Sequence, residues 1–295
     1  MGKFLDRAGP VTVVVIGLFM VWYVAAIALN TPWAQDKANR AGIELSTSEL
    51  IADTMSQQKP RLPAPHQVVA EIWKTTGEMA LKGRAFSKRS LFYHGWVTFS
   101  ATIVGFALGT GLGILLAVGI VHNYTIDKSI MPWVVASQTI PILAIAPMII
   151  VVLNAIGIAG LLPKAVISMY LSFFPVVVGM VKGLRSPDHM QFDQMKTWNA
   201  SNFQTFWKLR LPSSMPYLFT SMKIAMAASL VGAIVGELPT GAVAGLGARL
   251  LGGSYYGQTI QIWSALIAAA ALAACLVGII GLIQSNVLKK MGMAQ

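Results

Sequence analysis

Residues 129–181 have the sequence SIMPWVVASQTIPILAIAPMIIVVLNAIGIAGLLPKAVISMYLSFFPVVVGMV, in which Lys164 is the single charged residue. As one helix, this stretch would be about 80 Å long at roughly 1.5 Å per residue. That is more than twice the thickness of the hydrocarbon core of a bilayer, which is roughly 30 Å. The stretch therefore predicts two crossings of a membrane.

The composition of the whole chain agrees with a membrane protein. Of its 295 residues, 55% are hydrophobic and 11% are charged, whereas an average soluble domain has about 25% charged residues. The net charge of +11 comes from Lys and Arg between the apolar blocks, so we expect contact with the lipid bilayer and no nucleic-acid partner. Cys275 is the one cysteine, and the four histidines have no ligand spacing, so we expect neither a disulfide nor a metal site.

The apolar blocks are long enough for membrane-spanning helices of roughly 20 residues. They predict an all-α polytopic membrane protein with about six transmembrane helices, at residues 11–29, 96–121, 131–157, 161–181, 218–235 and 260–287. In the third span, Pro141 and Pro147 each predict a kink. In the second span, Gly105, Gly109 and Gly113 predict close packing against another helix.

The basic residues predict how the spans are oriented. Segment 182–223 has six basic residues against two acidic ones, and both termini are basic. Because cytoplasmic loops are enriched in Lys and Arg, we expect this segment and both termini in the cytoplasm. The first apolar run contains Ala26-Ile27-Ala28, which is similar to a signal-peptidase site, so a cleaved signal peptide is the alternative for this segment. Its 19 residues exceed the usual hydrophobic region of a signal peptide, and we expect residues 1–30 to form an uncleaved N-terminal transmembrane anchor. Residues 31–95 are then an external loop. Within that loop, helical spacing of apolar residues predicts a short interfacial helix at Val68, Val69, Ile72 and Trp73.

The most informative segment is polar and has the sequence SPDHMQFDQMKTWNASNFQTFWKLRLP at residues 186–212. Ser186 followed by Pro187 predicts the start of a short helix, which we expect to end at a left-handed Asn199. Ser201 with Gln204 forms a capping box for a second short helix, which we expect to end before Pro212.

This second helix is expected to present Phe203, Phe206 and Trp207 on one face. Such a face predicts a docking surface for a protein partner. The alternative is an amphipathic hairpin that lies among lipid headgroups with its aromatic rings in the bilayer.

Four polar residues in or next to the spans are candidates for a solute pathway or gate. Gln138, Thr139 and Asn154 lie on the kinked third span, and side chains that only hydrogen-bond neighbouring helices would give the same pattern. Glu237 follows the apolar run of the fifth span. It is either a functional carboxylate or a structural one that pairs with Arg249 or Lys164.

Segment 186–212 resembles the cytoplasmic coupling loop of binding-protein-dependent ABC importer permeases. The family pattern is Glu-Ala-Ala, three residues, Gly, nine residues and Ile-x-Leu-Pro. Asp193 stands at the Glu position, Asn199 at the Gly position and Leu209-Arg210-Leu211-Pro212 at the end, with Gln194-Met195 replacing Ala-Ala. The resemblance extends from about Leu62 to the C-terminus, and it is closest to the nitrate, sulfonate, taurine and pyrimidine-precursor subgroup. Where that subgroup usually has Trp-Phe-Gly, this chain has Leu153-Asn154-Ala155.

The resemblance implies a permease domain at residues 96–290 with a five-helix core and a coupling loop at 183–217. It implies the transmembrane subunit of an importer in a bacterial inner membrane, which moves a nitrate-, sulfonate- or taurine-like solute, or a pyrimidine or flavin precursor, by ATP-driven alternating access. Its partners would be an ABC ATPase subunit, a periplasmic or extracellular solute-binding protein and a second permease copy in a homodimer. The implied ATPase-coupling residues are Asp193, Lys196, Asn199, Ala200, Phe203, Phe206, Trp207, Lys208, Arg210 and Pro212.

The chain has no G-x-x-x-x-G-K-[ST] phosphate loop, and no constellation of nucleophile and base lies in its spans. We therefore expect no enzyme and no cofactor, with ATP hydrolysis supplied by a separate subunit. The alternative function is an ion-coupled secondary transporter or channel subunit. That class usually has several membrane-buried acidic residues and internal repeats, whereas this chain has Glu237 and no clear repeat.

Overall fold

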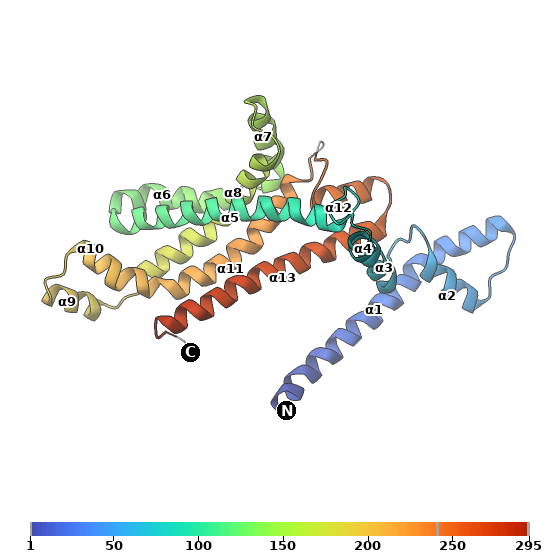
Figure 1. The fold of residues 1–295 in the computed structure, drawn as a ribbon, viewed down its shortest axis with the longest axis horizontal. Coiled ribbons are helices and arrows are strands. Elements are labelled where there is room, and N and C mark those ends of the chain that lie inside the picture. Colours follow the sequence, from blue (N-terminus) through green and yellow to red (C-terminus); the bar gives the residue numbers. More distant parts are fainter. Residues whose placement is uncertain (1, 240–241, 294–295) are drawn as a thin grey trace. The chain divides into compact units, whose positions relative to one another are not determined.

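The computed structural model describes residues 2–239 and 242–293, with side chains from residue 9 onward, and all regular elements in these ranges are helical. The all-α prediction is confirmed (Figure 1). The helices are α1 (Gly2–Ala41), α2 (Thr47–Ser56), α3 (Pro65–Thr75), α4 (Gly77–Leu81), α5 (Leu91–His122), α6 (Tyr124–Ala136), α7 (Ile142–Ala155), α8 (Leu161–Leu184), α9 (His189–Thr197), α10 (Asn202–Thr205), α11 (Leu211–Gly236), α12 (Leu246–Tyr255) and α13 (Thr259–Lys290).

Within the described ranges, five helical segments are long and apolar enough to cross a membrane, at residues 9–41, 91–122, 161–184, 202–236 and 259–290. They contain five of the six predicted spans. The predicted span at 131–157 is instead a pair of helices, α6 with its 3₁₀ turn Ser137–Thr139 and α7, bent by 102°. This pair brings the number of spans to six if it crosses the membrane as one broken span.

Pro141 explains where this span breaks. Proline disfavours a helical conformation in the residue before it, and Ile140 accordingly has φ −84° and ψ 121°. Pro141 itself precedes the first residue of α7. Pro147, by contrast, lies inside α7, which continues past it to Ala155. The predicted kink is therefore a complete break at Pro141, while Pro147 does not end the helix.

The chain forms two compact units, of which one comprises residues 94–248 and 269–295. In this unit α5 packs closely on α8. A Cβ on Gly113 would lie 2.8 Å from Val176 Cβ, and a Cβ on Gly105 or Gly109 would overlap a serine of α8. The predicted close packing of these glycines is thus confirmed.

Hydroxyl groups connect three helices of the same unit. Ser168 Oγ of α8 donates to Ser229 O of α11 at 2.7 Å, and Ser229 Oγ donates to Thr102 O of α5 at 2.9 Å. Interhelical hydrogen bonds of this kind hold helices together in lipid, where burial of apolar surface between helices gains little.

Lys223 was predicted to be one of the loop cations of segment 182–223, and this prediction is wrong. It lies in the middle of α11, and a Cβ on Gly281 of α13 would lie 3.7 Å from Lys223 Cε. Segment 182–223 thus has one loop cation fewer than predicted, although it remains more basic than acidic.

The other unit comprises residues 1–93 and 249–268. Here α1 runs 11 residues beyond the expected anchor of residues 1–30 and ends at Ala41. Asn30 of α1 is fully buried and binds the segment before α3. Its Oδ1 accepts from Arg61 N at 2.8 Å and Leu62 N at 3.2 Å, and its Nδ2 donates to Leu62 O at 2.9 Å. The predicted short helix is α3, in which Val68 is buried while Val69 and Trp73 are exposed.

Candidate coupling loop and solute pathway

The first helix of the loop, α9, begins two residues later than predicted. Asp188, and not Ser186, is its N-cap, because Asp188 Oδ1 accepts from His189 N at 2.7 Å. Gln191 Oε1 accepts from Asp188 N at 3.0 Å, which completes a capping box. Ser186 Oγ instead donates to Gly183 O at 2.7 Å. The side chain of Ser186 therefore caps the C-terminal end of α8.

The turn after α9 has the predicted conformation. Asn199 has φ 51° and is the one non-glycine residue with positive φ in the described part of the chain. Asn199 N donates to Lys196 O at 2.8 Å, and Ala200 N donates to Met195 O at 3.0 Å. These bonds satisfy the last carbonyls of α9, as in the common left-handed ending of a helix.

The second helix begins as predicted but does not end before Pro212. Gln204 N donates to Ser201 Oγ at 3.2 Å and Ser201 N donates to Gln204 Oε1 at 2.9 Å, which is the predicted capping box. After α10, a π turn at Phe206–Arg210 leads directly into α11, and Leu211 N donates to Phe206 O. Proline lacks the N–H of a regular helix, and the π turn rearranges the backbone hydrogen bonds before Pro212. One helix therefore runs from Asn202 to Gly236.

The aromatic residues of this helix divide into an exposed pair and a packed residue. Phe203 is 70% exposed and Trp207 is 52% exposed, and their ring centroids lie 6.0 Å apart. Phe206 packs against the core cluster that contains Ile120 and Met180. The expectation of one shared face is therefore wrong for Phe206. Sequence reasoning also missed Trp198, which is exposed in the turn.

The charged residues of the loop are mostly exposed. Lys196 Nζ lies 3.0 Å from Asp193 Oδ1 on the surface of α9, and Lys208 is exposed as well. Arg210 differs, because its guanidinium carbon lies 4.9 Å from the ring centroid of Phe192. This cation–π contact joins α9 to the start of α11.

Glu237 lies at the other end of α11 and is completely buried. Thr98 Oγ1 of α5 donates to the carboxylate at 2.9 Å, and Gly247 N donates to Oε2 at 2.9 Å. Lys164 Nζ of α8 lies 4.0 Å from Oε1. Of the two cations considered in the sequence analysis, Lys164 is the partner, and Arg249 pairs with Glu71 instead.

The turn over this carboxylate requires glycine. Gly245 has φ 128°, and a Cβ there would overlap the carboxylate of Glu237. Gly245 N donates to His94 Nδ1 at 3.1 Å, and Leu246 N donates to Thr98 Oγ1 at 2.8 Å. The buried carboxylate therefore holds the turn against α5 and α8.

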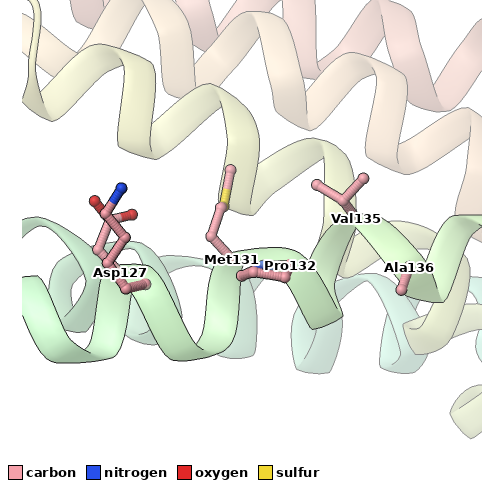
Figure 2. Close-up of a pocket in the computed structure, with 6 residues that line it drawn as sticks. Asp127, Met131, Pro132, Val135 and Ala136 are labelled. Carbon is pink, nitrogen blue, oxygen red and sulfur yellow. The ribbon is translucent and has the colours of Figure 1, made fainter.

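The other pathway candidates are exposed, whereas Glu237 is buried. Gln138 and Thr139 are exposed in the 3₁₀ turn at the broken span, and Asn154 is exposed in the last turn of α7. The length of α7 separates them by roughly 20 Å. A groove of about 580 Å³ follows α6 toward the break. Figure 2 shows its lining residues along one helix: Asp127, Met131, Pro132, Val135 and Ala136.

A bundle of membrane-length helices with a broken span and a capped two-helix loop between two spans defines a membrane transporter subunit. The chain belongs to the family of binding-protein-dependent transport system inner membrane components, whose model matches residues 109–292. It is therefore a permease subunit of an ABC importer, a multi-pass inner-membrane protein and not an enzyme.

Relatives of this chain carry different solutes according to their names. A formylaminopyrimidine transport permease protein of Halalkalibacterium halodurans is 32% identical over 67% of this chain and 72% of the relative. A riboflavin transport system permease protein of Chloroflexus aurantiacus is 28% identical over 64% of this chain and 65% of the relative. A nitrate import permease protein of Leptolyngbya laminosa is 24% identical, with coverage of 76% and 78%.

The fold also has a solved counterpart. A chain of the inward-facing MetNI methionine ABC transporter matches with a TM-score of 0.50 and 19% sequence identity. The match covers 76% of this chain and 96% of that chain. This similarity supports the importer-permease fold.

Proposed function

We propose that this permease imports a small, nitrogen-containing heterocycle, of the pyrimidine- or flavin-precursor class, by ATP-driven alternating access. The single observation that carries the transport mechanism is the unbroken helix from Asn202 to Gly236. It connects the coupling loop directly to the buried Glu237 turn at its other end. A displacement of the loop is therefore passed to the far end of the span.

The coupling loop is proposed to dock an ATPase subunit on the cytoplasmic side. Phe203 and Trp207 are the anchors, because they are large, exposed and adjacent, and aromatic residues dominate protein interfaces. The capped turn at Asn199 holds α9 beside them. The other residues in the proposed contact are Asp193, Lys196, Ala200, Lys208, Arg210 and Pro212, and Phe206 supports the loop from the core.

The broken span is proposed to line the solute pathway. Backbone groups at a helix break must be paired by neighbouring protein or by a water-filled cavity. Gln138 and Thr139 lie at the break and are neutral, as is Asn154. Neutral donors and acceptors suit a heterocycle better than an oxyanion such as nitrate or a sulfonate. The more similar of the relatives described above also carry pyrimidine- and flavin-type solutes by name.

The remaining partners are proposed from the family and from exposed surface. Large apolar residues are exposed on α6 and α7: Trp133, Leu143, Met148, Val151 and Val152. A second permease copy in a homodimer would cover this face. A solute-binding protein would deliver the solute from outside, where residues 31–95 are proposed to lie, and both termini would be cytoplasmic.

The test begins with the solute-binding protein that we expect to be encoded beside this permease. We expect calorimetry to detect tight binding of a formylaminopyrimidine or a flavin, and no binding of nitrate or taurine. Uptake of that ligand into vesicles should require the permease, the ATPase and ATP. Tight binding of an oxyanion alone would contradict the proposed solute class, and uptake driven by an ion gradient without ATP would contradict the mechanism.

A further inference from the structure

A cavity of about 530 Å³ is lined by the end of α5, by α9 and by residues of the segment 200–210. The anchors Phe203 and Trp207 do not line it, whereas four residues that are also proposed to contact the ATPase do: Asp193, Lys196, Ala200 and Arg210. Its lining includes Phe192, Asp193, Lys196, Asn202, Thr205 and Arg210. We propose that this cavity binds a phosphate group, and that its source is an anionic phospholipid of the adjoining leaflet.

The charges around the cavity favour an anion. Asp193 is the one carboxylate in its lining, and Lys196 neutralises it at 3.0 Å. Arg210 makes no ion pair with a carboxylate among the described residues. The cavity therefore has an uncompensated positive charge beside a neutralised pair.

Hydrogen-bond donors in the cavity are also available. The Arg210 guanidinium carbon lies 4.9 Å from the Phe192 ring centroid, and within the described residues its N–H groups donate to no acceptor. Within the described residues, no acceptor binds the side chains of Asn202 or Thr205. Arginine offers a planar set of donors that matches two phosphate oxygens, and the amide and hydroxyl can bind the others.

The position of the cavity favours a lipid as the source. Tyr124 begins α6, two residues after His122 of the cavity, and is 75% exposed. Lys128 Nζ lies 5.6 Å from the Tyr124 ring centroid. Exposed aromatic residues with basic neighbours mark the membrane–water boundary, and basic pockets between helices at that boundary bind lipid headgroups.

A bound phosphate would strengthen the attachment of α9 to α11. It would fix Arg210, which already contacts Phe192 of α9, and would add bonds to Asn202 and Thr205 of α10. Any effect on coupling rests on the proposed function of the loop. Phosphate binding does not depend on that function, and it is measured on the permease alone. The phosphate site and the proposed coupling function can therefore fail separately.

The experiment measures lipid retention by the purified full-length permease. Native mass spectrometry in detergent with equal phosphatidylglycerol and phosphatidylcholine should show retention of phosphatidylglycerol. Loss of a charge-assisted contact in Arg210→Gln should weaken that retention roughly tenfold. Arg210→Lys keeps the charge, so its retention of phosphatidylglycerol should lie between that of the wild type and that of Arg210→Gln. As a control, Lys289→Gln removes one exposed cation at the end of α13. Its retention of phosphatidylglycerol should stay within about twofold of the wild type. Thermal unfolding would verify that each variant is folded.

A second arm distinguishes the source of the phosphate. Inorganic phosphate is titrated by calorimetry into the permease in phosphatidylcholine alone. Arg210-dependent binding of inorganic phosphate, without retention of phosphatidylglycerol, would keep the phosphate site but overturn the lipid source. Equal retention by the wild type, Arg210→Gln and Lys289→Gln in both arms would overturn the proposal. So would displacement of both ligands by the ATPase subunit, because the cavity would then hold a protein side chain.

Discussion

The coupling loop and the Glu237 turn lie at opposite ends of one helix and are stabilised in different ways. In the loop, each hydrogen bond described above joins residues close in sequence, such as Ser201 with Gln204 or Ala200 with Met195. At the turn, Glu237 binds Thr98, which is 139 positions away. The loop is thus formed by local capping and stays exposed, whereas the turn is formed by buried tertiary contacts. Exposure lets the loop contact a partner protein, and buried tertiary contacts fix the Glu237 end of the span.

The largest expected effect is at the turn. Glu237→Ala removes the acceptor of the Gly247 N–H and takes the carboxylate away from the largely buried Lys164. Breaking a buried ion pair costs about 3–5 kcal/mol. We expect a sharp loss of folded protein in thermal unfolding and in yield. Glu237→Gln keeps the size and one acceptor, so it should fold and transport nearly normally. Normal folding with altered uptake in Glu237→Gln would instead assign the carboxylate to a gate.

The second effect separates docking from folding within the loop. Phe203→Ala and Trp207→Ala should each weaken ATPase binding by about 2 kcal/mol, because exposed aromatic anchors are typical interface hot spots. The unfolding temperature of the permease should not change in Phe203→Ala, and it should fall only slightly in Trp207→Ala, whose ring centroid lies 5.5 Å from that of Phe206. Phe206→Ala removes a residue packed in the core and should lower that temperature. Copurification and thermal unfolding measure the two effects, and wild-type ATPase yield with Phe203→Ala/Trp207→Ala would contradict the docking surface.

A smaller effect is expected at the turn residue Asn199, whose φ is 51°. Asn199→Gly should be nearly neutral, since glycine adopts this conformation freely. Asn199→Val should strain the backbone by about 1–2 kcal/mol and uncouple ATP hydrolysis from transport. ATPase activity and uptake measured in the same vesicles test this prediction, and equal coupling in Gly and Val variants would exclude the left-handed turn.

The smallest effect is expected for the exposed ion pair of α9. The side chains of Lys196 and Asp193 are 79% and 69% exposed, and such pairs contribute little in water. Lys196→Gln should leave the unfolding temperature of the permease unchanged at any salt concentration. A measurable shift would show that α9 is packed more tightly than its exposure indicates.

The same contrast explains what the sequence could predict. The Asn199 turn and the Ser201–Gln204 capping box depend on residues within four positions, so their residue types were sufficient. The broken span could be located from Pro141 but not its 102° bend, which depends on how α7 packs on α8. Asn30 and the orientation of Phe206 were missed because both depend on partners far along the chain.

Errors at helix boundaries have a related cause. Ser186 and Asp188 are both good N-caps, and the contact of Ser186 with Gly183 decides between them. A helix often ends before a proline, so Pro212 predicted an end. The π turn at Phe206–Arg210 allows the helix to continue past it. The partners of Glu237 could be narrowed to two cations from the sequence, and the packing of α8 against α11 selects Lys164.

Because the helix continues through Pro212, the span can act as a lever. A segment of 35 residues is about 50 Å long at roughly 1.5 Å per residue. The π turn at Phe206–Arg210 and the prolines Pro212 and Pro216 lie within this segment and do not interrupt it. If its pivot lies where Gly232 and Ser229 contact α8, close to the Gly236 end, its two arms are unequal. A force on the longer arm at the loop is then multiplied at the shorter arm, which ends at the glycine turn over Glu237.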